Sequence, residues 1–208
     1  MTGTGTDEGS VGVDAGANLL SAGAPRVAEP RFVADVMLGR LARWLRALGS
    51  DTLYAPSVSD ARLLGVSLRD GRCLLTRDVA LARRAAARGL LVRGDTLDEQ
   101  LRQVVDRYGL SGRDLLTRCL ECNVVLERIE ADHVRGQVPP YTLATQRDFR
   151  RCAACRRVYW PGTHAVGIQA RLRPYLEVSA RRGLGSAEGP SGPSGEPASP
   201  NQGNSQDR

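Results

Sequence analysis

The 208-residue chain is predicted to be an α/β protein, in which a parallel sheet flanked by helices precedes a small cysteine-bound metal domain. Two observations support this expectation. Short apolar runs alternate with helical segments from residue 32 to residue 108, a pattern typical of parallel strands with helices on both faces. Two Cys-x-x-Cys pairs then follow, and four cysteines in this arrangement are typical of a tetrahedral zinc site.

The α/β region contains four apolar runs, each followed by a segment with helical spacing. The expected strands are 32–34, 51–55, 73–76 and 90–92. The expected helices are 38–48, a helix from the N-cap Ser59 to about Arg69, 79–88 and 96–108. Short links between these elements favour parallel strands, whose carboxyl ends meet at one edge of the sheet.

The first expected helix has two distinct faces. One arc is apolar and consists of Leu41, Trp44, Leu45 and Leu48. The opposite arc is basic and consists of Arg40, Arg43 and Arg46. Gly49 is a natural stop for this helix.

Both ends of the chain are expected to be disordered tails, because they contain few large apolar residues to offset chain entropy. These tails are residues 1–30 and 182–208. They enclose an α/β domain over 31–112 and a zinc ribbon over 113–168.

The net charge of +6 is concentrated in the middle of the chain. Residues 1–30 carry −3 and residues 181–208 carry zero, which leaves +9 for 31–180. A folded body this basic indicates a polyanionic partner such as a nucleic acid, although a merely soluble basic protein has the same property. No apolar run is long enough to span a membrane, and the N-terminal residues lack the pattern of a secretory signal, so we expect no secretory signal and a cytoplasmic location.

Aspartates follow the expected strands. Asp35 and Asp78 come directly after the first and third strands, Asp95 follows the fourth, and Asp60 begins the helix after the second. At one sheet edge these like charges would raise one another's pKa or bind a cation, and carboxylate oxygens suit Mg²⁺ or Mn²⁺. Such an ion can activate water for phosphodiester hydrolysis. All four are therefore candidate catalytic residues, with Asp35 and Asp78 as the candidate ligands of the ion.

Two of these aspartates have an equally simple explanation. Asp60 and Asp95 each stand at the start of a helix, where a carboxylate can serve as a cap. The spacing leaves this alternative open.

The zinc ligands are expected to be Cys119, Cys122, Cys152 and Cys155. The 29 residues between the two pairs predict a ribbon with a long inserted loop, in which Pro139-Pro140 favours an extended path. A redox role for one pair is the alternative. Cys73 lies within a strand and is expected to be a buried core thiol.

Arginines flank the second cysteine pair, and Tyr159-Trp160 follows it. A basic rim with aromatic neighbours suits single-stranded nucleic acid, although a solvated rim with structural aromatics has the same pattern. The expected phosphate-binding residues are Arg40, Arg43, Arg77, Arg150, Arg156 and Arg157. The sequence leaves open whether His164 has a structural or a functional role.

The motifs together resemble one family. They are FVADVMLGRLARWLRALGSDTLY, CLLTRD, RCLECNVVL, VPP and FRRCAACRRVYWPGTH, in this order over about residues 31–165. The chain resembles the Mut-seven C-terminal ribonuclease family, a PIN-like nuclease fold with a C-terminal zinc ribbon. The resemblance implies RNA cleavage by acidic residues with a divalent cation. By motif, Asp35 and Asp78 match the family's acids most directly, followed by Asp60 and Asp95.

The expected function is a metal-dependent ribonuclease with a structural Zn²⁺ and a catalytic Mg²⁺ or Mn²⁺. A non-catalytic RNA-binding module is the main alternative. A toxin of the PIN-like type is a third hypothesis, which the long ribbon argues against.

Overall fold

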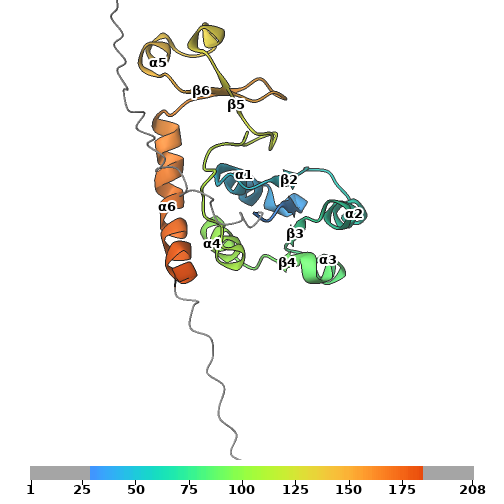
Figure 1. The fold of residues 1–208 in the computed structure, drawn as a ribbon. Coiled ribbons are helices and arrows are strands. Elements are labelled where there is room, and N and C mark those ends of the chain that lie inside the picture. The colour runs from blue at the N-terminus through green and yellow to red at the C-terminus, as the bar shows by residue number, and fades with distance from the viewer. Residues whose placement is uncertain (1–28, 185–208) are drawn as a thin grey trace, which may run out of the picture.

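The computed structural model describes residues 29–184, drawn in colour in Figure 1. Residues 1–28 and 185–208, which make up nearly all of the two predicted tails, lie outside the described part. The last helix, α6 (Thr163–Leu184), includes residues 182–184, where the second predicted tail begins. Within residues 29–184, no helix combines the length and the apolar character needed to cross a membrane.

Four parallel strands form the main sheet, and each lies within a residue or so of its predicted position. They are β1 (Phe32–Ala34), β2 (Thr52–Tyr54), β3 (Cys73–Thr76) and β4 (Gly89–Leu91). Their order across the sheet is β2-β1-β3-β4, and every neighbouring pair is parallel. Ala34 lies opposite both Tyr54 and Leu75, so β1, β2 and β3 end at the same edge.

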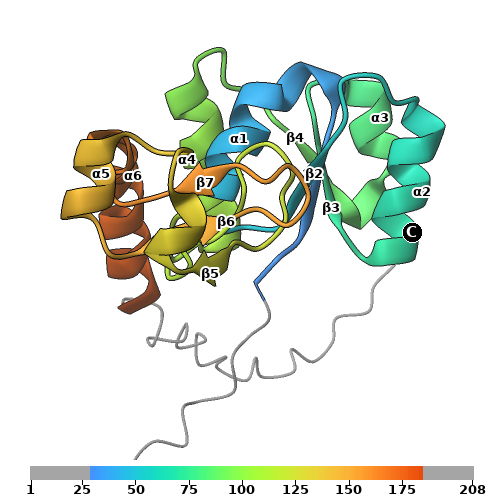
Figure 2. The same cartoon turned by 90° about the horizontal axis from the view of Figure 1, so that it is seen from above.

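Helices cover both faces of this sheet, as the strand–helix alternation predicts. The helical elements are η1 (Val36–Leu38), α1 (Gly39–Ala47), α2 (Asp60–Asp70), α3 (Val79–Arg84), η2 (Ala86–Arg88) and α4 (Leu97–Tyr108). Figure 2 shows α1 and α4 on one side of the strands and α2 and α3 on the other. Because side chains alternate along a strand, Phe32 joins the core under α1 and α4, whereas Val33 joins the core under α2 and α3.

Local capping explains where these helices begin. The Ser59 side chain accepts a hydrogen bond from the Arg62 N–H at 3.4 Å and caps α2, as predicted. Thr96 and Glu99 form a reciprocal capping box at the start of α4.

Gly49 lies just beyond α1 and has a positive φ of 92°. A Cβ atom at this position would lie 2.2 Å from the carbonyl oxygen of Asp114. Glycine is therefore required both for the backbone conformation and for the close approach of the segment that leads into the second domain.

The second domain is a small antiparallel sheet of order β5-β6-β7 with short helices inserted. Its elements are β5 (Glu127–Ile129), η3 (Ala131–Val134), α5 (Pro140–Thr145), β6 (Phe149–Arg151) and β7 (Val158–Tyr159). It lies beside α1 and β2 in Figure 1. The insertion between the cysteine pairs contains helical elements, whereas a long loop was expected. Pro139 is extended, but Pro140 begins α5, where proline is tolerated because the first N–H of a helix has no partner within the helix.

Helix α6 was not predicted, and its start overlaps the predicted ribbon over residues 163–168. The helix packs along α4, and Figure 1 shows the two side by side. Ile168, Leu172 and Tyr175 are buried in the main core at the i, i+4, i+7 spacing of one helix face. The chain after the second domain therefore folds back onto the α/β domain as α6.

The packing of α6 yields a first prediction. Leu172 is 0% exposed, so Leu172→Ala should lower the free energy of unfolding by about 2–5 kcal/mol through lost burial and a residual cavity. Val166 on the same helix is 60% exposed, and Val166→Ala should change it by less than about 0.5 kcal/mol. Urea unfolding of both variants tests this, and similar values for the two would mean that α6 does not pack as described.

Candidate functional site

Asp35 and Asp78 lie at the carboxyl-terminal edge of the sheet and share a contact with Thr76, the last residue of β3. The Thr76 hydroxyl donates a hydrogen bond to Asp35 Oδ2 at 2.8 Å and accepts one from the backbone N–H of Asp78 at 3.0 Å. Asp35 is only 6% exposed, whereas Asp78 is exposed. One hydroxyl group at the sheet edge therefore connects the Asp35 carboxylate to the backbone of Asp78.

Neutral donors hold both carboxylates. Asp35 accepts from the Val36 N–H, and Asp78 Oδ1 accepts from the Leu81 N–H at 2.7 Å, which caps α3. Within residues 29–184 neither carboxylate forms an ion pair. These hydrogen bonds fix the side chains while their negative charges face no arginine, an arrangement suited to a bound cation.

Asp60 and Asp95 are placed differently. Asp95 is paired with Arg77, with 2.7 Å between Oδ1 and the guanidinium nitrogen, and its side chain is 87% exposed. Asp60 lies in the first turn of α2, with an oxygen 3.9 Å from Arg84. Ser59 and Thr96 are the caps of α2 and α4, so neither aspartate caps its helix.

The four cysteines converge as predicted. Their sulfur atoms all lie within 4.8 Å of one another, and in the described part of the chain they are the one group of three or more His, Cys, Asp or Glu residues this close. The sulfurs of Cys119 and Cys155 are 3.7 Å apart. Zn–S bonds of about 2.3 Å in a tetrahedron place sulfurs about 3.8 Å apart, so the spacing is consistent with zinc.

The two cysteine pairs have the same local structure. Asn123 follows Cys122 and Arg156 follows Cys155, and both have a positive φ, of 65° and 63°. In each turn this residue donates its N–H to the carbonyl of the first cysteine at 2.9 Å. The second cysteine of each pair directs its N–H at the first sulfur, at 3.4 Å from Cys122 and 3.5 Å from Cys155. These turns aim the sulfurs at one point.

One thiol is electrostatically prepared for metal binding. Burial raises the pKa of Cys119, but hydrogen bonds from Tyr159 and from backbone N–H groups outweigh it and lower this pKa to about 7. The Tyr159 hydroxyl lies 3.2 Å from the sulfur. Because the thiolate is the form that binds a metal, these contacts favour metal binding near neutral pH.

Arg46 joins the first cysteine turn to the α/β domain. It was predicted on the exposed basic arc of α1, and this prediction is wrong because the side chain is buried. Its guanidinium donates to the carbonyl of Thr52 at 2.9 Å, of Leu120 at 2.9 Å and of Glu121 at 2.7 Å. The last two carbonyls lie between the cysteines of the first pair, so Arg46 holds that turn against the domain.

Asn123 completes this connection. Its side-chain oxygen accepts from the Thr52 N–H at 2.9 Å, and its amide nitrogen donates to Asp51 at 2.7 Å. Burial raises the pKa of Asp51, but hydrogen bonds from Arg72 and Asn123 outweigh it, so the pKa lies below its ordinary value. Sequence reasoning missed Arg46 and Asn123; the asparagine directly after a Cys-x-x-Cys turn was the available signal.

The predicted phosphate-binding arginines divide into two groups. Arg40 and Arg43 lie on the exposed side of α1, and Arg77 lies at the carboxylate edge in its pair with Asp95. Arg150, Arg156 and Arg157 belong to the second domain. Arg43 and Arg157 come from different domains and share Glu121, at 2.8 and 3.4 Å.

Arg46 gives a second prediction. Arg46→Met leaves three carbonyls without a donor and should lower the free energy of unfolding by about 1.5–3 kcal/mol. Arg40→Met, on the exposed side of the same helix, should change it by less than about 0.5 kcal/mol. Denaturant unfolding measures both values. Equal losses would show that the charge of the helix, rather than the buried contacts, is responsible.

Metal content gives a third prediction. The purified chain should contain one zinc ion, and Cys119→Ser should lose it because three thiolates bind zinc less well than four. Cys73 lies outside the cluster, so Cys73→Ser should retain the ion. Elemental analysis of the three proteins decides the matter, and zinc retained by Cys119→Ser would contradict the assignment.

Comparisons with known proteins identify the family of the chain. No curated protein and no solved structure matches the chain. The family model described as the Mut7-C RNAse domain matches residues 30–172, which is more than half of the chain. The match runs from the start of β1 to Leu172 of α6 and includes the paired aspartates and all four cysteines. The chain therefore belongs to the Mut7-C RNAse domain family.

Proposed function

We propose that this protein is a metal-dependent ribonuclease that hydrolyses RNA phosphodiester bonds at the carboxyl-terminal edge of its main sheet. The observation that carries the proposal is the position of Asp35 and Asp78 at one sheet edge, where Thr76 contacts the Asp35 carboxylate and the Asp78 backbone N–H, with no arginine ion-paired to either carboxylate in residues 29–184. Membership of a ribonuclease-domain family supplies the substrate class.

The donor set suits Mg²⁺ or Mn²⁺. Mg²⁺ is commonly held by one or two carboxylates together with substrate phosphates and water, and hard carboxylate oxygens are its preferred ligands. An ionised carboxylate has about four acceptor positions. Asp35 uses two of them on Val36 and Thr76, and Asp78 uses one on Leu81, so both retain capacity for a cation.

A divalent cation held there would activate a water molecule and stabilise the negative charge that develops on the phosphate. The protein's own groups keep the carboxylates in place. Thr76 fixes the orientation of Asp35 by donating its hydroxyl hydrogen, and the cap on α3 fixes Asp78. Preorganised ligands of this kind avoid a reorganisation cost during the reaction.

Asp60 and Asp95 serve as further acids in the proposal, each beside an arginine. Arg77 stands between Thr76 and Asp78 in the chain and pairs with the exposed Asp95. An exposed pair of this kind contributes little stability, about 0–1 kcal/mol, so an RNA phosphate can replace the carboxylate on Arg77. This exchange would free Asp95 near the site.

The RNA chain would continue along α1 toward the second domain. Met37, two residues after Asp35, is 65% exposed, and such an apolar side chain can contact a base or ribose. Arg40 and Arg43 follow one helical turn apart on the exposed side of α1, and Arg156 and Arg157 extend the basic surface onto the ribbon. Arginine binds phosphate in bidentate fashion, so this series suits a polyanionic backbone.

A non-catalytic RNA-binding module is the second candidate function. It is favoured by the arginine partners of Asp60 and Asp95, because a site that works with three or four free carboxylates would need these pairs to open. The two candidates differ in one property, which is cleavage that depends on Asp35.

The fourth prediction separates them. Asp35→Asn should lower RNA cleavage in Mn²⁺ or Mg²⁺ by at least about 10²-fold, since an amide lacks the charge that holds the cation, while RNA affinity changes little. Asp132→Asn is a matched control, because Asp132 is exposed in the second domain and pairs only locally with Arg135. Gel assays of labelled single-stranded RNA, with and without EDTA, measure both properties.

Two results would count against the enzyme. Cleavage that persists in EDTA would show that the reaction does not need a divalent cation. If Asp35→Asn cleaved RNA as fast as Asp132→Asn, Asp35 would not belong to the catalytic site. If the protein bound RNA without cleaving it, the RNA-binding module would be favoured.

A further inference from the structure

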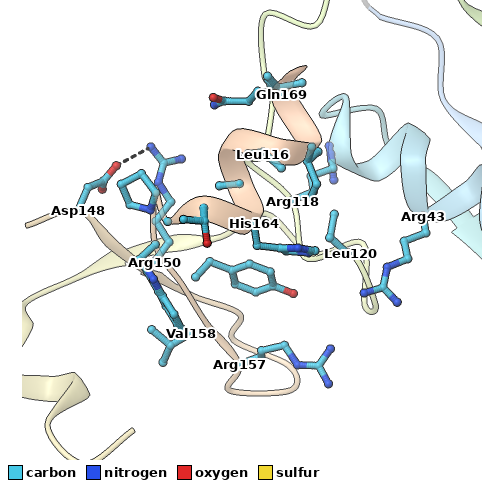
Figure 3. Close-up of a pocket in the computed structure, with 18 residues that line it drawn as sticks. Arg43, Leu116, Arg118, Leu120, Asp148, Arg150, Arg157, Val158, His164 and Gln169 are labelled. Atoms are coloured by element: carbon cyan, nitrogen blue, oxygen red, sulfur yellow. Dashed lines mark ion pairs between the residues drawn. The ribbon is translucent and has the colours of Figure 1, made fainter. Parts of the chain in front are cut away.

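A pocket of about 440 Å³ lies between the two domains, away from the paired aspartates. Figure 3 shows Arg43 of α1 on one side, Arg150, Arg157 and Val158 on the ribbon side, and His164 of α6 between them. A smaller cavity of about 250 Å³ shares Arg43 and His164 and extends to Trp44. Because α1, the ribbon and α6 all contribute, the pocket exists only when the domains are docked.

The charge of the pocket favours an anion. Its lining contains four arginines, Arg43, Arg118, Arg150 and Arg157, and one acid, Asp148. Arg118 is fixed by bonds to the carbonyls of Gly49 at 2.8 Å and Asn123 at 2.9 Å. The first turn of the 22-residue helix α6 also lines the pocket, so the positive end of its dipole adds to the arginines.

Two acidic residues form ion pairs with some of these arginines but do not neutralise the pocket. Asp148 lies 3.6 Å from Arg150, and Glu121 forms ion pairs with both Arg43 and Arg157. The side chains of the Glu121 pairs are about half exposed, and such pairs are weak in water. A phosphate can therefore compete for the arginines, while Glu121 keeps two of them close to the opening.

The remaining lining suits a nucleobase. Leu116, Leu120 and Ile168 are apolar, and Tyr159 and Trp160 provide aromatic surface. His164 and Gln169 of α6 carry groups that both donate and accept hydrogen bonds, which can pair with the edge of an unstacked base. A phosphate site next to aromatic and base-pairing groups matches a nucleotide better than a simple anion.

We propose that this pocket binds one unstacked nucleotide of a single-stranded RNA, with its phosphate on the arginines and its base against the aromatic and apolar lining. The proposal rests on the ribonuclease function above and adds a separate substrate-binding position to it. Arg43 follows Asp35 by eight residues, across the 3-10 turn η1 and the first part of α1, so Arg43 lies on the order of 12 Å from the carboxylate edge. The pocket would thus hold the RNA at a set distance from the scissile bond.

The chain provides its own probe for this pocket. It has two tryptophans, and Trp160 lines the pocket while Trp44 lines the adjoining cavity. In a Trp44→Phe background the emission comes from Trp160 alone. Full-length zinc-loaded protein would be titrated with AMP, with inorganic phosphate, and with a single-stranded hexaribonucleotide, without Mg²⁺ or Mn²⁺ so that the RNA stays intact.

AMP and the hexanucleotide should quench Trp160 saturably, and inorganic phosphate at the same concentration should not, because it has no base to stack. Arg150→Ala and, at an exposed position, His164→Ala should each weaken AMP binding by about tenfold, the contribution of one charge-assisted or specific hydrogen bond. Arg83→Ala removes the same charge from the exposed side of α3, outside the pocket lining, and should change binding less than twofold.

Failure would be unambiguous. Absence of saturable quenching by AMP, or equal weakening by Arg150→Ala and Arg83→Ala, would overturn the pocket, even if the enzyme cleaves RNA in an Asp35-dependent way. Conversely, AMP quenching that Arg150→Ala weakens would support the pocket even if the protein did not cleave RNA. The two proposals therefore fail separately.

Discussion

The buried guanidinium of Arg46 is the contact on which the arrangement of the two domains depends. Burial lowers the pKa of Arg46, while the negative charges of Cys119, Glu121 and Cys122 raise it, so part of the cost of burying the cation is offset. Four thiolates around a Zn²⁺ ion would carry a net charge of about −2, which Arg46 is placed to compensate in part. One residue therefore donates to three carbonyls and joins α1 to the first cysteine turn.

Several features follow from this junction. The ribbon turn meets β2 at Thr52, the start of the strand, whereas Asp35 and Asp78 lie beyond the other ends of the strands. The ribbon thus leaves the carboxylate edge open and instead forms the arginine-lined pocket with α1 and α6. A metal ion on the four cysteines would support the docking of the domains, because its loss would release the turn that Arg46 holds.

Features set by neighbouring residues could be predicted from the sequence, and features set by distant ones could not. The strands, the Ser59 cap, the cysteine site and the placement of Asp35 and Asp78 depend on local patterns and on the rule that parallel strands end together. Arg46 has the spacing of a solvent-facing arginine, and it is buried against the carbonyls of Leu120 and Glu121, which lie 74 and 75 residues further along the chain. The partners of Asp95 and Asp60 could not be predicted either, because Arg77 and Arg84 are two of many exposed arginines. Helix α6 was missed although Ile168, Leu172 and Tyr175 have helical spacing, because Gly167 and Pro174 interrupt the pattern.

If Asp35 and Asp78 form a divalent cation site at the sheet edge, the protein should bind Mn²⁺ there. Electron paramagnetic resonance of free Mn²⁺ would be recorded during titration of zinc-loaded wild type and Asp78→Asn, each with an uncleavable 2′-O-methyl RNA. The wild type should bind one Mn²⁺ ion, and Asp78→Asn should bind it at least tenfold more weakly, since the amide removes a charged ligand. Equal Mn²⁺ binding by the two proteins, or none by either, would contradict this site.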